Sequence, residues 1–583
     1  MAHFPSDADA AAQPIRPSAP RRQGPWRGRF VVIGAVLLFF SALQFWRPYF
    51  FLTDENLSGV LPVFADLGNS MRKGIFPITN DALFNGTNNI WRDPGSLTLL
   101  FPVHIAAMFL ATSAIRLATI DIICLFHLLV GALAMRACIL SLGQRFQREV
   151  PSWLAAFLAV SYVASIYSVA VGSSWYNFLG SQASLPLVML GLLMKRRSTG
   201  TAVVTAGVLY GMLGGHMAPF LWAALFLGAF AVLFGLSERT WDPIRRYAIG
   251  CVGAGLLVLP VLIPATAGYV GSERAEVISD NAAVLYRLPL AALLFGSTLG
   301  VESLANWNFE PELGFLAEVD LPIAFSAAAL VFLAVLGSAW RFRRLEWILV
   351  AILASLALLL HRPVWLQHVI SSIPMYRALR WPMREALIFL FFAHLLVAAG
   401  WSRLPRRLGS TLPVLSGVMF CVLLFSSSSP TFNRFPTDRT LLLTGRAEDV
   451  WRQVIELMPR AQECRVVPLY APQNGDWMGR FFVKLAPHTL MGGYNYPALF
   501  GMKSVTGYVM PGFAQQFRGV MPIFGPGYFP PAFAPADFND PTLLFTQLHA
   551  VDPLTVEYRI GETKVHAVLP HGVESAAVVT RVP

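Results

Sequence analysis

Long runs of apolar residues recur along most of the chain and are separated by short polar segments. Four of the longest runs contain no charged residue, at 31–45, 221–236, 321–340 and 348–360. A helix needs about 20 apolar residues to cross the hydrocarbon layer of a bilayer, and shorter runs are accommodated when the bilayer thins. The pattern therefore predicts an α-helical, polytopic membrane protein.

The basic residues between these runs predict an orientation for each helix. Short cytoplasmic loops are enriched in Lys and Arg, and the chain begins with 1–28, a segment rich in Ala, Pro and Arg that we expect to be disordered and cytoplasmic. Placing every later basic turn on the same side predicts about eleven membrane helices within 29–427. We expect the crossings near 31–45, 118–141, 152–170, 181–194, 201–213, 217–236, 247–268, 321–340, 345–361, 385–401 and 411–427.

Two features leave alternatives open in this topology. The first apolar run follows Arg27 and Arg29, as the apolar region of a signal peptide would, but it ends at Gln44 without the small residues of a cleavage site. We therefore interpret it as an uncleaved helix. A further apolar patch, 288–299, lies in a long segment that we expect to be external. If this patch crosses the membrane, every later helix is inverted.

Two segments are expected on the outer side. The first is a loop, 47–116, whose apolar stretch 99–110 is too short to cross and is expected to be an interfacial helix. The second is 428–583, in which Pro- and Gly-rich turns separate short β-branched or alternating runs typical of strands. With a helix expected at 447–457, this segment is predicted to form a small α+β domain on the outer face.

Composition agrees with a membrane protein and excludes several functions. Of the 583 residues, 55% are hydrophobic and 13% are charged, about half the charge of a soluble domain. The net charge of +11 follows from basic cytoplasmic loops, and no basic stripe with aromatic residues lies in a polar segment, so we expect no nucleic-acid partner. The five cysteines have no CxxC or metal-ligand spacing, and the chain has no P-loop, GxGxxG or HExxH motif.

Two adjacent acids, Asp54 and Glu55, follow the first helix directly in the sequence Thr53-Asp54-Glu55-Asn56. Carboxylates at a membrane surface are costly to desolvate and can act as a general base or as metal ligands. The alternative is a solvated helix cap, because Asp and Asn favour such positions. Both interpretations stay open on the sequence.

Four arginines lie in a loop expected to be external, against the positive-inside tendency: Arg362, Arg377, Arg380 and Arg384. Guanidinium groups bind phosphate through paired hydrogen bonds. The alternative is that these side chains extend to lipid headgroups.

The stretch Gly214-Gly215-His216 lies at the outer end of the fifth expected crossing. Two glycines allow the backbone to approach a ligand or another helix closely, and a single histidine at such a place is more often packed or hydrated than a ligand. His104, in the interfacial stretch, has the same alternatives.

The acid after the first helix is accompanied by the stretches 74–77 (GIFP), 83–86 (LFNG), 100–102 (LFP), 213–216 (LGGH), 374–384 and 491–508. In these residues the chain resembles the YfhO-type bacterial membrane proteins, which are relatives of the GT-C glycosyltransferases. It departs from the usual family pattern where Met217 and Ala218 follow His216 and where Glu55 adds a second acid.

The resemblance implies a GT-C-like fold in the bacterial inner membrane, with 428–583 in the periplasm. GT-C enzymes transfer a sugar from a polyprenyl-phosphate carrier on the outer face, so the implied partners are that donor, an envelope glycan or lipid acceptor, and membrane lipids. Asp54 or Glu55 would then deprotonate the acceptor hydroxyl, and inversion at the anomeric carbon would follow. The implied substrate-binding residues are Arg377, Arg380, Arg384, His216, Gly215 and His104.

Some relatives use a divalent metal ion, and the sequence does not decide whether this chain needs one. The main alternative function is a non-catalytic component of polysaccharide or lipid transport or assembly. A proton-coupled pump is disfavoured because acids are almost absent from the expected helices; Asp121 lies near an outer end.

Overall fold

The computed structural model describes residues 27–53, 56–75, 79–80, 88–89, 98–147, 150–270, 326–361, 363–373, 385–426, 443, 465–468, 496–499, 503–504, 554–560, 563–569 and 577–580. Its longer helices are α1 (Arg27–Trp46), α2 (Leu61–Arg72), α3 (Pro102–Ala111), α4 (Thr119–Arg145), α5 (Ser152–Val163), α6 (Ile166–Ser174), α7 (Tyr176–Leu193), α8 (Arg197–Gly214), α9 (Met217–Glu238), α10 (Asp242–Val270), α16 (Ala329–Leu336), α17 (Arg344–His361), α18 (Val364–Ser371), α20 (Ala386–Gly400) and α21 (Arg406–Ser426). Short helices are η1 (Asn56–Val60), η5 (Arg116–Ala118), η8 (Ala339–Arg341), η10 (Trp401–Arg403) and α26 (Tyr496–Leu499).

The membrane class predicted from the sequence is confirmed, because the described part contains six helices that are long and apolar enough to cross a bilayer. The bent pair α5–α6 raises this number to seven if the pair is one span. The six spans are 28–46, 116–145, 217–238, 242–266, 344–361 and 386–403. The predicted number of about eleven stays a prediction.

The described part shows fewer recognisable spans than the sequence predicts, partly because α7 is not uniformly apolar. Ser181, Gln182 and Ser184 lie on α7 and are buried inside the bundle. A helix surrounded by other helices needs no apolar surface toward lipid, so hydropathy alone does not mark it as a span. Both α7 and α8 nevertheless lie among the long helices, packed on each other and, in the case of α7, on α4.

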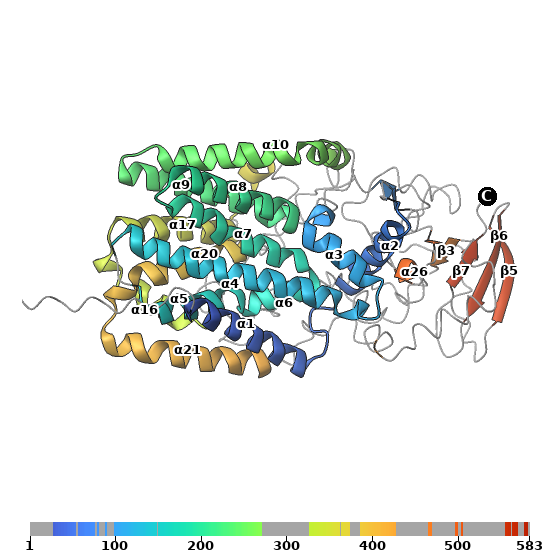
Figure 1. Ribbon diagram of the computed structural model, residues 1–583, viewed down its shortest axis with the longest axis horizontal. Helices are drawn as coiled ribbons and strands as arrows, with labels where there is room; N and C mark the ends of the chain where they lie inside the picture. The colour runs from blue at the N-terminus through green and yellow to red at the C-terminus, as the bar shows by residue number, and fades with distance from the viewer. Residues whose placement is uncertain are drawn as a thin grey trace, which may run out of the picture.

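The long helices lie side by side, and their connections gather at two ends (Figure 1). The turns α4–α5, α7–α8, α9–α10, α16–α17 and α20–α21 lie at one end, and they contain the basic residues that predict the cytoplasmic side. We call this the basic end. The helices α2 and α3 and the strands lie beyond the opposite end, which we call the outer end.

Close glycine contacts hold α7 against α8. A side chain at Gly180 would overlap the carbonyl of Gly214, and one at Gly191 would lie 2.6 Å from the carbonyl of Gly200. Small residues of this kind allow membrane helices to approach closely and gain packing energy. Gly215 takes part in the same contact, because a side chain there would meet Ser181 of α7.

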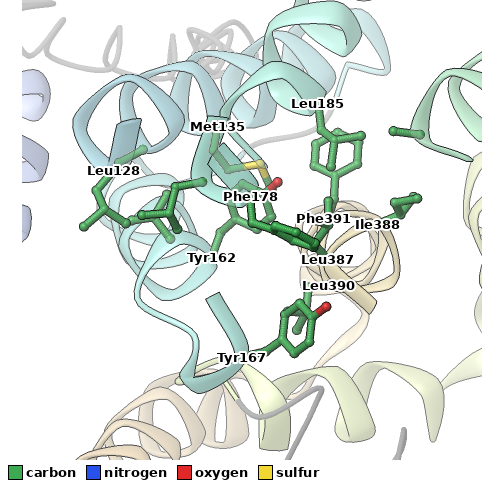
Figure 2. Close-up of a cluster of buried hydrophobic side chains, with 14 of the residues drawn as sticks. Leu128, Met135, Tyr162, Tyr167, Phe178, Leu185, Leu387, Ile388, Leu390 and Phe391 are labelled. Atoms are coloured by element: carbon green, nitrogen blue, oxygen red, sulfur yellow. The ribbon is translucent and has the colours of Figure 1, made fainter. Parts of the chain in front are cut away.

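The centre of the bundle is formed by α20, in which every residue is buried. Figure 2 shows Leu387, Leu390 and Phe391 of this helix among side chains of α4–α7, including Tyr162 and Met135. Because this helix is buried on all sides, its apolar side chains pack on other helices and not on lipid. The described core therefore lies between α20 and the α4–α7 segment.

At the outer end, α2 packs on α3, and a side chain at Gly68 would overlap the backbone of Met108. The expected interfacial helix at 99–110 forms as α3. The short α26 packs on α2 and buries Ala498 and Leu499.

The strands form two sheets. β1 (Thr79–Asn80) pairs antiparallel with β2 (Asn88–Asn89). The second sheet has the order β4-β3-β7-β6-β5, in which only β3 and β4 pair in parallel. Its strands are β3 (Arg465–Pro468), β4 (Lys503–Ser504), β5 (Leu554–Ile560), β6 (Thr563–Leu569) and β7 (Ala577–Thr580). Most of 428–583, the predicted helix at 447–457, the patch 288–299 and segment 1–26 lie outside the described residues, so the α+β domain stays a prediction.

Candidate functional site

The predicted site residues fall into two groups. His104, Gly215 and His216 lie within the described part of the chain. The acids and arginines of the prediction lie outside the described residues: Asp54, Glu55, Arg362, Arg377, Arg380 and Arg384. The structure therefore defines the surroundings of the acid pair through the residues on either side of it.

Asn56 follows the acid pair and joins two helix ends. Its Nδ2 lies within hydrogen-bond distance of the carbonyls of Gly172 (2.8 Å) and Ser173 (2.9 Å), and its Oδ1 accepts from the backbone N–H of Tyr176 (3.0 Å). These carbonyls belong to the last turn of α6, and that N–H belongs to the first residue of α7. Helix ends leave such groups without partners inside the helix. One fully buried amide thus serves both ends of the α6–α7 junction.

Thr53 precedes the acid pair and is anchored at the same junction. Its hydroxyl donates to the carbonyl of Ser173 at 2.9 Å, and the side chain is buried. The two residues that bracket Asp54 and Glu55 are therefore both held on the last turn of α6.

Asp121, in the first turn of α4, fixes the preceding turn of the chain. Its Oδ1 accepts from the side-chain amide of Gln44 at 2.5 Å and from the backbone N–H of Phe51 at 3.1 Å. Gln44 in turn accepts from the N–H of Tyr49 at 2.8 Å, where the backbone has a φ of 57°. The intramembrane acid noted in the sequence therefore positions the start of the first external loop.

His104 of this loop, His127 and Tyr210 form a hydrogen-bonded chain across three helices, and both histidines are buried. The Nδ1 of His104 lies 2.5 Å from the carbonyl of Thr98, and its Nε2 lies 3.1 Å from the Nε2 of His127. The Nδ1 of His127 lies 2.7 Å from the hydroxyl of Tyr210. The chain therefore links α3, α4 and α8.

The acceptor at one end determines where the protons lie. A carbonyl only accepts, so Nδ1 of His104 donates to Thr98, and in a neutral ring Nε2 is then an acceptor. The Nε2 of His127 must donate to it, which leaves Nδ1 of His127 to accept from the hydroxyl of Tyr210. Every ring nitrogen has a partner while both histidines are neutral.

Aromatic rings enclose this chain, which we call the histidine chain. Phe101 lies 5.0 Å from the His104 ring and 4.9 Å from the Tyr210 ring, between centroids, and Tyr176 lies 4.9 Å from His104. Burial in these surroundings lowers the pKa of His104 to about 4, because the charged imidazolium loses its hydration. His104 is therefore neutral at neutral pH.

The two histidines fit a direct hydrogen bond better than a shared metal ion. Their ring centroids lie 5.4 Å apart and their Nε2 atoms 3.1 Å apart. The distance between the ring centroids exceeds the distance between the Nε2 atoms by close to two ring radii. Each Nε2 therefore points directly at the other, and no metal ion fits between them. Among the residues that the structure describes, no group of three or more His, Cys, Asp or Glu side chains is placed to bind a metal.

His216 has the contacts of a helix cap. Its Nδ1 accepts from the N–H of Ala218 at 3.2 Å at the start of α9, and its ring lies 4.6 Å from that of Phe178. Its backbone exchanges two hydrogen bonds with the Ser181 hydroxyl. These contacts agree with the packing interpretation of the Gly-Gly-His stretch, and a substrate-binding role for it stays a prediction.

Sequence reasoning missed His127, Tyr210 and the buried His394. The Nδ1 of His394 donates to the carbonyl of Leu390 at 2.7 Å, and its Nε2 lies 3.2 Å from the Ser161 hydroxyl. The signal that could have found them is a polar, ionisable residue within an apolar run, because such residues are costly in a membrane and usually have a partner.

The chain matches no known protein family, no curated protein and no solved structure. Function therefore rests on the residues themselves and on the resemblance described above.

Proposed function

We propose that the protein is a GT-C-like inverting glycosyltransferase of the bacterial inner membrane. It moves a sugar from a polyprenyl-phosphate donor to an envelope glycan or lipid on the outer face. The observation that carries the proposal is the anchoring of Thr53 and Asn56 at the α6–α7 junction. A general base must be held within hydrogen-bond reach of its substrate, and both chain neighbours of the acid pair are fixed.

In the proposed reaction, Asp54 or Glu55 accepts the proton of the acceptor hydroxyl. The oxygen then forms a bond to the anomeric carbon as the bond from that carbon to the carrier phosphate breaks, which inverts the configuration. The leaving polyprenyl phosphate gains negative charge, and Arg377, Arg380 and Arg384 stabilise it. Metal dependence stays open in this proposal.

The proposed topology has about eleven crossings, with 428–583 in the periplasm. Two features of the described part support it. The basic turns gather at one end of the bundle, and the strands of 428–583 lie beyond the other end, as do α2 and α3 of the first external loop (Figure 1). The packing of α7 and α8 among the spans supports counting them as crossings.

The decisive test replaces each acid with its amide and profiles envelope glycans in a deletion strain complemented with each variant. Asp54→Asn keeps the size of the side chain but removes the base, so we expect loss of transfer at wild-type protein levels. Glu55→Gln should retain more activity if Asp54 is the base. Asp66→Asn, on α2 of the same external loop, is the matched control and should transfer normally.

Normal glycans in both single variants and in the Asp54/Glu55 double variant would contradict the enzyme proposal. The alternative, a non-catalytic component of envelope transport or assembly, is supported by the packing of α26 on α2, which joins the C-terminal segment to the first loop. It predicts that Leu499→Asp disturbs function while the double amide variant does not.

A further inference from the structure

Arg136 lies in the second half of α4, toward the basic end, and is 8% exposed. Its Nη2 donates to the hydroxyl of Ser152, the first residue of α5, at 3.2 Å. Gly28 of α1 gives it room, since a side chain there would overlap the guanidinium. The charged group is therefore enclosed by the starts of α1 and α5.

Other arginines at this end have carboxylate partners. Arg145 pairs with Glu238 at 3.4 Å, and Arg403 pairs with Glu346 at 3.4 Å. For Arg136, by contrast, the structure shows no ion pair within the described part of the chain, and Arg29, which carries a charge of the same sign, lies close enough to act on it. Its Nε is buried without a hydrogen-bond partner.

A buried charge without compensation costs several kcal/mol, so proteins usually supply an opposite charge or a ligand. The start of α5 adds to the positive potential here. Its cap residue is Pro151, which makes no side-chain hydrogen bond to the first-turn N–H groups. Helix starts attract anions through these N–H groups and the helix dipole.

Tryptophan side chains place this site at the level of lipid headgroups. Trp153, next to Ser152, is 51% exposed, and its ring lies 5.4 Å from that of Trp401. Trp241, Trp340 and Trp347 are also exposed on helix ends and turns at the basic end. Tryptophan is enriched at membrane–water interfaces because its ring is apolar and its N–H is polar.

We propose that Arg136, Arg29 and the first turn of α5 bind one phosphate group at the basic end. Guanidinium donors and helix N–H groups together match the oxygens of a phosphate. The chemistry is shared by two sources, the headgroup of an anionic phospholipid and a soluble phosphate. The site is independent of the proposed glycosyl transfer, which concerns the opposite end.

The test measures thermal unfolding and ligand retention in native mass spectra for the purified full-length protein in detergent. Phosphatidylglycerol, phosphatidylcholine and inorganic phosphate are added separately. A lipid site predicts stabilisation and retention with phosphatidylglycerol only, whereas a soluble-phosphate site predicts stabilisation by inorganic phosphate as well. Arg136→Met should weaken binding at least tenfold, and Arg136→Lys should weaken it less because it keeps the charge but lacks the fork.

Arg29→Gln, an exposed position, provides a second variant if Arg136→Met does not fold, and it should weaken binding severalfold. Arg145→Met is the matched control, because that arginine already has Glu238, and it should bind normally. Without added anion, Arg136→Met should be as stable as the wild type. The proposal is overturned if no added anion binds through these residues. It is also overturned if Arg136→Met loses the same amount of stability with and without anion, since that result would show that the charge is compensated within the protein.

Discussion

The two ends of the bundle satisfy their buried polar groups in different ways. Among the described residues at the outer end, neutral hydrogen bonds join the helices: Asn56 joins α6 to α7, and the histidine chain joins α3, α4 and α8. Among those at the basic end, charged pairs join the helices, such as Arg403 with the fully buried Glu346. Neutral networks require well-defined geometry, whereas ion pairs tolerate variation in distance but respond to salt. The ends should therefore respond differently to mutation and to solution conditions.

The largest expected effect is at the α6–α7 junction. Asn56→Leu removes the partner of the Tyr176 N–H and of the Gly172 carbonyl while leaving both buried. Each buried unsatisfied group costs about 1–3 kcal/mol, so we expect a loss on the order of 4 kcal/mol, seen as a large fall in the thermal midpoint in detergent. Asn69→Leu, on an exposed position of α2, should change stability little. Equal effects would mean that the junction is not held by Asn56.

The next largest expected effect is a pH dependence of stability at the outer end. Because burial lowers the pKa of His104 to about 4, the unfolded chain, with its ordinary pKa of about 6.5, binds a proton first as pH falls. The stability that His104 contributes is thus present above about pH 6.5 and is lost as pH falls toward 4. The loss is on the order of 3 kcal/mol at pH 4.

Three polar groups face His104 and would be disturbed when its ring takes up a proton. His127 from α4 shares its hydrogen bond, Tyr176 from α7 lies edge-on to its ring, and Thr98 accepts from it. His104→Gln should flatten the decline of the unfolding midpoint between pH 6.5 and 4.5. His368→Gln, on α18 and exposed, is the matched control and should retain the decline. A decline unchanged in His104→Gln would assign it to different titrating groups.

How far the sequence predicts the structure differs between the helices and their contacts. Apolar runs predict α9, α10 and α17 well, because a lipid-facing helix must be apolar along its length. The sequence predicts one helix at 152–170, but the run divides into α5 and α6, and the hydroxyl of Ser165 caps the start of α6. Polar residues at the break hydrogen-bond inside the bundle, which periodicity does not reveal.

The candidate site was less predictable, because it depends on which helices become neighbours. His104 and His127 are 23 positions apart, and Tyr210 is 83 positions beyond His127. No short motif links them, so a single sequence shows them only as isolated polar residues. The acid pair was noticeable because both carboxylates are adjacent in the chain, but the anchoring of its neighbour Asn56 depends on α6, 116 positions away.

The smallest expected effect concerns the exposed ion pair at the basic end. Arg145 and Glu238 lie 3.4 Å apart with side chains 28% and 36% exposed, and pairs of this kind contribute about 0.2–1 kcal/mol. Glu238→Gln should therefore lower the thermal midpoint slightly in low salt and not at all in about 1 M salt, where charges are screened within about 3 Å. Glu346→Gln removes the buried partner of Arg403 instead and should lower the thermal midpoint more. Salt should change that loss little, because water does not reach Glu346. If both variants responded to salt alike, the basic end would be hydrated throughout. The buried and exposed ion pairs of this end would then not differ in their response to salt, because water would reach Glu346 as it reaches Glu238.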